Sequence, residues 1–291
     1  MPPKQPQPDG PAVSAAPASA APARPVLAPA DYEAIHEFLE RNAGIRLGAG
    51  KEYLVTSRLG RLIRSHGLAD FPALVSQLQA PGSRQLQVAV VDAMTTNETF
   101  WFRDPVHYRI LTEVVEPQAP GRGLRIWSAA CSTGQEPYTL AMVLHEARNG
   151  RSPGPHTIIG TDISTLALAQ ARQGRYCGLS AARGLSDDQR QRYFEHDGDC
   201  LEVRPEFRRG VEFREFNLLR PYDLLGRFDV VYCRNVLIYF SAERKRDILE
   251  RIARVLNPGG HLFLGSTESM NGHGDLFEMQ SHCGGLVYRR R

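Results

Sequence analysis

The sequence predicts an α/β protein with a small all-helical N-terminal domain and a doubly wound domain after it. Two patterns predict this fold class. Apolar residues recur at helical spacing from Asp31 to Met94, and from Leu124 onward short apolar strands alternate with helical stretches. Such alternation is typical of a parallel sheet with helices on both faces. The stretch from Leu124 to Tyr138, which reads as a strand, a tight turn and the start of a helix, opens the second domain.

Composition disfavours several classes of protein. The 291 residues carry a formal net charge of +3, which is too small to indicate nucleic-acid binding. No apolar run approaches the roughly 18 residues that a membrane helix needs. The five cysteines are scattered, odd in number and without a Cys-x-x-Cys pair, so we expect a reducing compartment and no metal site. We therefore expect a cytoplasmic protein without membrane insertion. We also expect a monomer.

Shifts in composition divide the chain into four parts. The first is rich in Ala, Pro, Ser and Gln and has too few large apolar residues to form a core, so we expect it to be disordered. The predicted parts are this tail, the helical domain, a connecting helix with its linker, and the sheet domain, at residues 1–28, 29–103, 104–123 and 124–291.

Four helices are expected in the helical domain. Asp31 caps the first, which ends near Gly44. The second spans about residues 50–66, and Asp70 and Ser83 cap the other two.

The second of these helices carries arginines at positions i, i+3 and i+6, namely Arg58, Arg61 and Arg64. A solvated helix face and a docking site for an acidic partner explain this row equally well. The residues alone leave both interpretations open.

The segment that joins the domains, residues 95–105, places three aromatic residues between polar ones, which is unusual for a linker. We expect Trp101 to seal the two domains together. Asn97, Thr99 and Arg103 are polar groups beside these rings and are expected to project into a cleft. The Asp-Pro pair at the end of the segment suits the cap and first position of a new helix.

The sheet domain is predicted to alternate strands with long helices and to close with a hairpin. The strands are expected at 124–130, 157–163, 211–217, 228–235 and 261–266, and the hairpin at 276–280 with 285–289. The helices are expected at 136–148, 164–173 and 242–256. An insert at about 174–210 is expected to hold a short helix around 187–194 and a small ribbon around 200–204.

Polar residues follow four successive predicted strands, at the edge where doubly wound folds bind nucleotide-like ligands. Asp162 can accept hydrogen bonds from two ribose hydroxyls, although a cap for the next helix explains it equally well. Asn217 can read an adenine edge. Glu136 and Asn235 can hold an ammonium group, and nothing in the set neutralises phosphate. A ligand that joins adenosine to an amino acid fits, which points to S-adenosylmethionine.

The same residues disfavour a dinucleotide. The turn after the first strand lacks the Gly-x-Gly-x-x-Gly pattern, and Glu136 within it would repel a pyrophosphate. An NAD-dependent dehydrogenase is therefore disfavoured.

Five blocks of sequence resemble the chemoreceptor glutamate methyltransferases, the CheR family. They are TTNETFWFR (95–103), SAACSTGQEPY (128–138), GTDI (160–163), FDVVYCRNVLIYF (228–240) and LNPGG (256–260). The resemblance covers about residues 30–290. It implies a Rossmann-like class I methyltransferase domain with a small inserted antiparallel β-subdomain. It also implies S-adenosylmethionine as methyl donor, S-adenosylhomocysteine as product, and glutamate side chains of chemoreceptors as acceptors, whose methyl esters serve sensory adaptation.

The resemblance also assigns residues. Carried over motif by motif, cofactor contacts fall on Asn97, Thr99, Arg103, Glu136, Asp162, Asn217, Leu218, Asn235 and Val236. The arginine row resembles the family's receptor-docking helix and so implies chemoreceptor cytoplasmic domains as partners.

One departure from the family concerns tethering. Some members grip a pentapeptide at the receptor's C-terminus with a longer, glycine-rich loop in the β-subdomain. Here the loop from His196 to Cys200 is short and acidic. We therefore expect the pentapeptide-independent type, which meets its receptor directly through the basic helix.

A glutamate acceptor needs no general base, because its unperturbed pKa of about 4.3 leaves it ionised at pH 7. The enzyme must align and desolvate it instead. Arg103 and Tyr239 are the candidate catalytic residues. Arg103 would pair with a carboxylate of the acceptor or the cofactor. Tyr239 would donate a hydrogen bond to the acceptor, although a core aromatic explains it nearly as well.

Two other functions remain open at this point. One is a methyltransferase of another protein or of nucleic acid. The turn that begins at Asn235 lacks the prolines found where exocyclic amines are methylated, which disfavours amine acceptors. The other is a non-catalytic module that senses the cofactor, which the intact set of strand-end residues disfavours.

Overall fold

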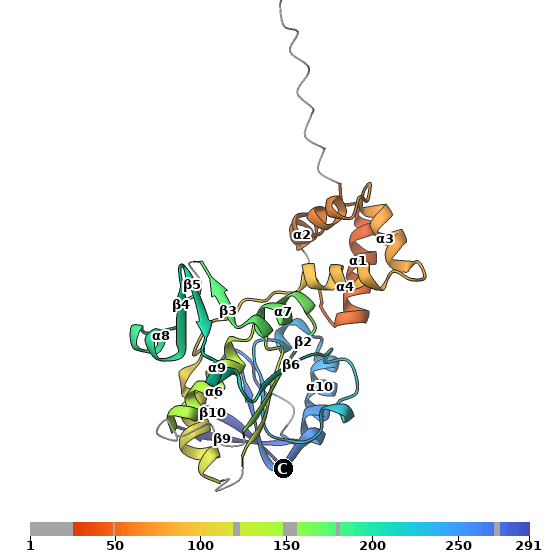
Figure 1. Ribbon diagram of the computed structural model, residues 1–291. Helices are drawn as coiled ribbons and strands as arrows, with labels where there is room; N and C mark the ends of the chain where they lie inside the picture. The colour runs from red at the N-terminus through yellow and green to blue at the C-terminus, as the bar shows by residue number, and fades with distance from the viewer. Residues whose placement is uncertain (1–25, 49, 119–122, 148–155, 179–180, 271–273) are drawn as a thin grey trace, which may run out of the picture.

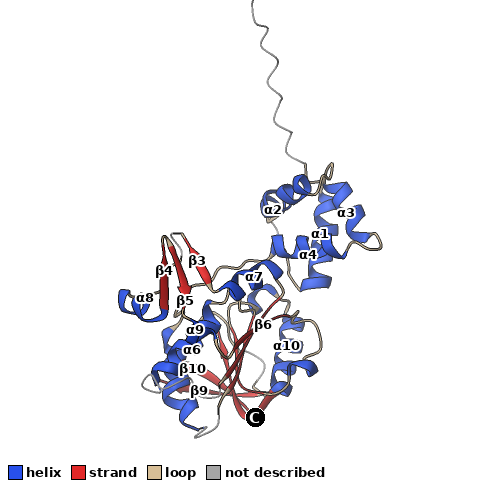
Figure 2. Cartoon of the chain, in the orientation of Figure 1, coloured by secondary structure: helices blue, strands red, loops and turns tan. Residues whose placement is uncertain are grey.

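The computed structural model describes residues 26–48, 50–118, 123–147, 156–178, 181–270 and 274–291. A helical domain lies above one end of a twisted sheet, and a small β-subdomain projects beside it (Figures 1 and 2). Most of the predicted tail, residues 1–25, lies outside the described residues.

Four helices build the helical domain within the part of the chain that the structure describes, as predicted. They are α1 Pro29–Ala43, α2 Glu52–Ser65, α3 Phe71–Gln79 and α4 Arg84–Met94. The Asp70 cap is confirmed, because its carboxylate accepts from Ala73 N at 2.9 Å. Two expected caps are wrong. Pro29 starts α1 two residues before Asp31, and the Ser83 hydroxyl donates to the Leu78 carbonyl instead of capping α4.

The connection contains α5 Pro105–Ile110, a π-helical turn Leu111–Val115 and a 3₁₀ turn Glu116–Gln118. Asp104 stands at the cap position of α5 with a φ of 54°, but its side chain makes no capping hydrogen bond, so the predicted cap is wrong. The carboxylate accepts from Arg234 at 2.6 Å instead of capping the helix.

Seven strands form the main sheet within the described ranges, in the order β6-β2-β1-β7-β8-β10-β9. Their bounds are β1 Arg125–Ala129, β2 Thr157–Asp162, β6 Val211–Glu215, β7 Phe228–Cys233, β8 Leu256–Leu264, β9 Phe277–His282 and β10 Gly285–Arg290. The sheet is mixed and not purely parallel, because β10 runs antiparallel to both β8 and β9. The predicted closing hairpin is confirmed.

Helices cover both faces of this sheet. The long helices are α6 Gln135–Ala147, α7 Thr165–Gln173 and α10 Ala242–Val255. Side chains of successive strand residues alternate between two cores. Ile126 packs with α5 and α6 on one face, whereas Trp127 packs with α10 on the other. Ala129 lies opposite Thr161 of β2 and Cys233 of β7, so three strand ends reach the same edge.

The insert folds as a three-stranded antiparallel sheet of order β3-β5-β4. Its elements are β3 Arg175–Cys177, α8 Asp187–Tyr193, β4 Phe194–Asp197, β5 Cys200–Val203 and α9 Pro205–Arg208. Trp101 is buried against this β-subdomain, with its ring edge-on to Tyr176 and Phe194. Trp101 therefore joins the linker to the insert. The expectation that it seals the helical domain to the sheet domain is wrong.

Two of the cysteines form a pair that their scattered spacing did not indicate. Cys177 and Cys200 form a disulfide, because the register of β3 and β5 places them directly opposite each other. Their separation of 23 residues carries no local signal of this pairing.

Candidate functional site

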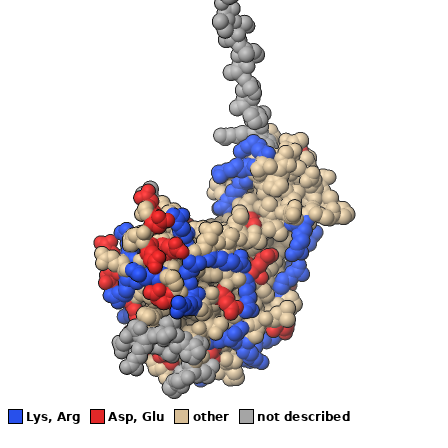
Figure 3. All heavy atoms as spheres, viewed as in Figure 1, with Lys and Arg blue, Asp and Glu red and all other residues tan. Residues whose placement is uncertain are grey.

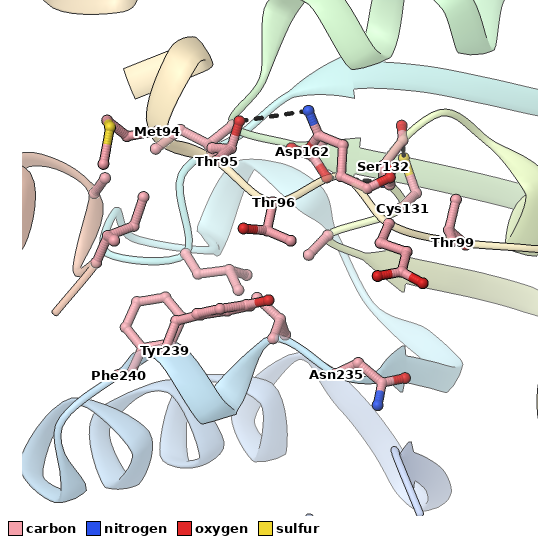
Figure 4. Close-up of a pocket in the computed structure, with 18 of the residues that line it drawn as sticks. Met94, Thr95, Thr96, Thr99, Cys131, Ser132, Asp162, Asn235, Tyr239 and Phe240 are labelled. Atoms are coloured by element: carbon pink, nitrogen blue, oxygen red, sulfur yellow. Dashed lines mark hydrogen bonds between the residues drawn. The ribbon is translucent and has the colours of Figure 1, made fainter. Parts of the chain in front are cut away.

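A cavity of about 310 Å³ lies at the carboxyl edge of β1, β2 and β7, where the helical domain meets the sheet domain. Figure 4 shows side chains from the linker, from the strand ends and from the turn after β7 around this space. Every residue predicted to contact cofactor or acceptor lines it, namely Asn97, Thr99, Arg103, Glu136, Asp162, Asn217, Leu218, Asn235, Val236 and Tyr239.

The turn after β1 is held in an unusual backbone conformation. Ala130 and Ser132 have φ values of 59° and 52°, a region that side chains other than glycine rarely adopt. The turn is fixed from outside: Ser132 N donates to the Asp162 carboxylate at 2.8 Å, and its hydroxyl donates to the Asn97 carbonyl at 2.8 Å. The loop from Cys131 onward thus brings linker, first strand and second strand together.

Asp162 lies at the end of β2 with 6% of its surface exposed. Its second oxygen accepts from Ser164 N at 2.8 Å, but the helix cap itself is Ser164, whose hydroxyl accepts from Ala167 N. Burial raises the pKa of the Asp162 carboxyl, and the backbone N–H groups of Ser164 and Ser132 oppose that rise. Each carboxylate oxygen can accept a further hydrogen bond, so the group can still receive two hydroxyls.

Asn217 follows β6, but its side chain is engaged elsewhere. The amide nitrogen donates to the Asn42 carbonyl at 2.6 Å, and the amide oxygen accepts from Leu219 N at 2.9 Å. The side chain thereby joins the sheet domain to the end of α1. This geometry does not support the expected hydrogen bonding of the Asn217 amide to an adenine edge. At this position a ligand would instead meet the apolar wall of the cavity that Asn217 forms with Leu218 and Phe216.

Glu136 is paired inside the protein, which the sequence reasoning missed. Its carboxylate accepts from Arg234 at 2.8 Å and from the Ser128 hydroxyl at 2.7 Å. Arg234 also donates to Asp104 and to the Arg103 carbonyl. The sequence placed Arg234 at the end of a predicted strand, but nothing in the local sequence indicated that it would pair with Glu136 and Asp104.

Arg103 and Asn97 come from the linker. The Arg103 guanidinium lies 5.4 Å from the centre of the Phe100 ring, a cation–π geometry that leaves its donors available to the cavity. The Asn97 amide donates to the Thr95 and Ser164 hydroxyls at 3.4 Å each. Figure 4 shows the first of these bonds as a dashed line.

Tyr239 is half-buried and follows β7 on the 3₁₀ turn η4 Leu237–Tyr239. Its ring forms the floor of the cavity beside Phe240, and its hydroxyl points into the space (Figure 4). The Tyr239 carbonyl accepts from Arg46 N of the helical domain at 3.2 Å. A side chain that lines this cavity is not simply a core aromatic, so of the two interpretations the geometry favours the site.

The arginine row on α2 divides into two kinds. Arg58 turns inward, lines the cavity, and donates to the carbonyls of Met94 and Thr95 at 3.0 and 2.9 Å. Arg61 and Arg64 are exposed. Basic side chains gather on the side of the helical domain where α2 lies (Figure 3). Arg58 therefore fixes the linker, and the exposed pair alone forms a free basic surface.

The cavity suits a nucleoside joined to an amino acid. Asp162 offers two acceptors for hydroxyls, Leu218 and Phe216 offer an apolar wall, and Arg103 offers a donor for a carboxylate. The sheet order and the position of this cavity are those of a Rossmann-like enzyme. In such folds the ligand binds where the strand order reverses, and here the reversal has β1 and β2 on one side and β7 on the other. The fold and site together define a methyltransferase of the S-adenosylmethionine-dependent class.

Comparison with known proteins identifies the family. Residues 97–283 match "CheR methyltransferase, SAM binding domain", and residues 30–95 match "CheR methyltransferase, all-alpha domain". The chain belongs to the CheR methyltransferase family. Its cofactor is therefore S-adenosylmethionine and its product S-adenosylhomocysteine, as predicted.

Curated relatives agree over nearly the whole length. The chain is 46% identical over 269 residues to chemotaxis protein methyltransferase Cher2 of Pseudomonas putida, spanning 90% of this chain and 98% of that protein. It is 44% identical over 265 residues to the chemotaxis protein methyltransferase of Vibrio parahaemolyticus, spanning 89% and 96%. For that of Escherichia coli the identity is 36% over 254 residues, spanning 85% and 87%. These matches do not favour the alternative functions considered above.

A separate finding concerns membranes. Among the described helices, none combines the length and the apolar character that crossing a bilayer requires.

Proposed function

We propose that this protein transfers the methyl group of S-adenosylmethionine to glutamate side-chain carboxylates of chemoreceptor cytoplasmic domains and forms methyl esters. When bound, the cofactor supplies an electrophilic methyl group. The remaining requirements fall on the chain itself, which must orient an already ionised acceptor and exclude water from it.

The observation that carries the proposal is that the described residues lining the cavity include no histidine and no carboxylate without a protein partner. Among the described residues that line it there is no histidine. Its carboxylates are engaged: Glu136 with Arg234, Asp162 with backbone N–H groups, and Glu98 with Arg183 at 2.8 Å. A hydroxyl or ammonium acceptor would need a group to take its proton, whereas a glutamate carboxylate would not.

The site residues take the following roles in this proposal. Asp162 accepts the ribose hydroxyls, and Arg103 pairs with the carboxylate of the cofactor or of the acceptor. The Tyr239 hydroxyl donates a hydrogen bond to the acceptor carboxylate. The other cofactor contacts are Asn97, Thr99, Glu136, Leu218, Asn235 and Val236, and Asn217 contributes only to the wall that it forms with Leu218, because its amide is bonded to Asn42 and Leu219.

Docking is assigned to the exposed pair Arg61 and Arg64, which lies one to two turns further along α2 than Arg58, a residue that lines the cavity. A partner with acidic side chains along a helix complements this surface. The two-residue turn Gly198-Asp199 between β4 and β5 supports direct docking without a pentapeptide tether. We further propose that the protein acts as a cytoplasmic monomer.

The test is methyl transfer to a purified receptor cytoplasmic fragment with tritiated S-adenosylmethionine. We expect label that mild alkali releases as methanol, and glutamate residues heavier by one methyl group in peptide mass spectra. Alkaline release separates esters from methylated amines, which survive this treatment. Label that resists alkali, or label on RNA in preference to the receptor, would overturn the proposal.

A further inference from the structure

One carboxylate outside the cavity lining holds the turn after β7. Glu268 accepts from Asn235 N at 2.6 Å and from Leu237 N at 2.8 Å. It also accepts from Gly265 N at 2.8 Å, directly after β8. Three backbone N–H groups from the ends of two neighbouring strands therefore meet on a single side chain. Such charge-assisted bonds are stronger than those between neutral groups.

The turn that Glu268 holds contains a residue in the left-handed backbone region. Asn235 has a φ of 57°, a conformation that asparagine adopts more readily than most residues with a side chain, but less readily than glycine. Val236 and Tyr239 follow in the same turn and line the cavity. The position of both side chains thus depends on the backbone conformation of this turn, which Glu268 fixes through the N–H groups of Asn235 and Leu237.

The packing around Gly265 supports the same conclusion. A Cβ atom on Gly265 would lie 2.6 Å from the Asn235 amide nitrogen and 2.8 Å from the Glu268 carboxylate. Both distances are too short for carbon contacts. The absence of a side chain at Gly265 is therefore what allows Glu268 and Asn235 to approach each other.

We propose that Glu268 is a positioning residue of the methyltransferase site. It acts through the backbone of Asn235 and Leu237, and it sets where Val236 and Tyr239 stand in the cavity. It does not touch the reacting atoms, because it is not part of the cavity lining. The part that concerns the acceptor, through Tyr239, rests on the proposed function, whereas the part that concerns the cofactor does not.

The test compares E268Q with the parent protein by calorimetric titration with S-adenosylhomocysteine, a measurement that needs no acceptor. Glutamine keeps the shape of the side chain but replaces one accepting oxygen by an NH₂ group, which cannot accept from an N–H. We expect the Kd for S-adenosylhomocysteine to rise at least tenfold. The matched control is E278Q on the exposed strand β9, for which we expect no change.

Two further measurements separate positioning from general stability. The melting temperature of E268Q should stay near that of the parent, while amide exchange at Asn235 and Leu237 should become faster. G265A should weaken binding in the same way, and the double variant should be little worse than either single one, because both changes release the same turn. Should E268Q fail to fold, E268D serves instead, since it keeps the charge but is too short to reach both segments.

Binding of S-adenosylhomocysteine within twofold of the parent in a folded E268Q or E268D protein would refute the proposal. Additive losses in E268Q and G265A would refute it too, since they would show separate effects. Failure of the proposed glutamate activity is a different result, because the calorimetric readout is independent of any acceptor.

Discussion

Arg234 and Glu136 form a buried ion pair at the carboxyl edge of the sheet, with 2.8 Å between nitrogen and oxygen and an Arg234 side chain that is 2% exposed. Asp104 is the second carboxylate on the same guanidinium, at 2.6 Å. The pair connects β7 to the first turn of α6 and to the linker. Its guanidinium therefore compensates two acidic groups that the fold has partly removed from water.

Arg234→Met should destabilise the protein by about 3–5 kcal/mol, because it leaves two carboxylates without their partner. Urea unfolding measures this loss. The matched control is Arg254→Met on α10, whose side chain is 75% exposed and whose pair with Glu250 is long, at 3.8 Å. That change should cost less than about 1 kcal/mol. Equal effects of the two substitutions would contradict the role given to Arg234.

Arg103→Ala should slow methyl transfer at least tenfold, which corresponds to about 1.4 kcal/mol on the barrier. The reason is that its guanidinium is available to a carboxylate in the cavity. Initial rates with a receptor fragment measure the effect, and exposed Arg220→Ala, outside this cavity, is the control. Normal turnover in folded Arg103→Ala protein would remove Arg103 from the mechanism.

Arg61→Glu combined with Arg64→Glu should reduce receptor methylation at least tenfold at low receptor concentration, because like charges would then face the acidic partner. Affinity for S-adenosylhomocysteine should not change. Arg58→Ala should instead weaken that affinity, since Arg58 holds the Met94 and Thr95 carbonyls at the cavity wall.

The control for the docking surface makes the same charge change elsewhere. Arg244→Glu with Arg254→Glu alters two exposed arginines on α10. This pair should leave receptor methylation near the parent rate. A similar loss in both double variants would mean that net charge, and not the α2 surface, governs docking.

Two buried histidines should make stability depend on pH. Burial lowers the pKa of His107 and of His261 to about 4. As pH falls below about 6.5, the unfolded chain takes up these protons and the folded protein does not, so the free energy of unfolding falls by up to about 1.4 kcal/mol per pH unit for each histidine until about pH 4. Stability is therefore expected to be lost on the acidic side of this window.

Urea unfolding at pH 6.5 and pH 5 tests this dependence. His261→Gln should reduce the difference between the two values, whereas exposed His66→Gln should not. The same pH slope in the His261→Gln protein would show that this histidine is not kept neutral by the fold.

The disulfide between Cys177 and Cys200 should stabilise the β-subdomain. Closing a loop of 23 residues corresponds to about 3 kcal/mol in the chain-entropy account. Reductant should therefore lower the melting temperature of air-oxidised protein, and a Cys177→Ser, Cys200→Ser double variant should not respond to it. A titration that finds all five cysteines as free thiols in such protein would contradict the disulfide.

The location of the cavity was predictable because parallel strands end at a common edge. A polar residue placed directly after a strand, such as Asp162, must lie at this edge once the neighbouring strands are in register. The same reasoning failed for Asn217, whose amide binds Asn42, 175 positions away in the chain. Spacing along a strand determines the edge at which a side chain stands but not the partner that it meets there.

Local patterns likewise could not reveal the partners of Asp104 and Cys177. Asp104 precedes a proline and has the local character of a helix cap, yet Arg234 from 130 positions away takes its carboxylate. Glu268 carried no signal at all, because its three bonds depend on how two strand ends meet. What cannot be predicted in each case is a contact that folding creates between distant segments.

The linker has a further consequence for protein engineering. Arg58 of the helical domain holds the Thr95 carbonyl, Ser132 of the sheet domain holds that of Asn97, and Trp101 donates to the Ala181 carbonyl of the insert at 2.8 Å. The helical domain, the sheet domain and the insert thus each form a hydrogen bond with the same short linker. A chimaera that exchanges the helical domain between relatives must therefore carry residues 95–104 together with their hydrogen-bond partners. A junction placed inside this linker would break the contacts through which it joins the three parts of the protein.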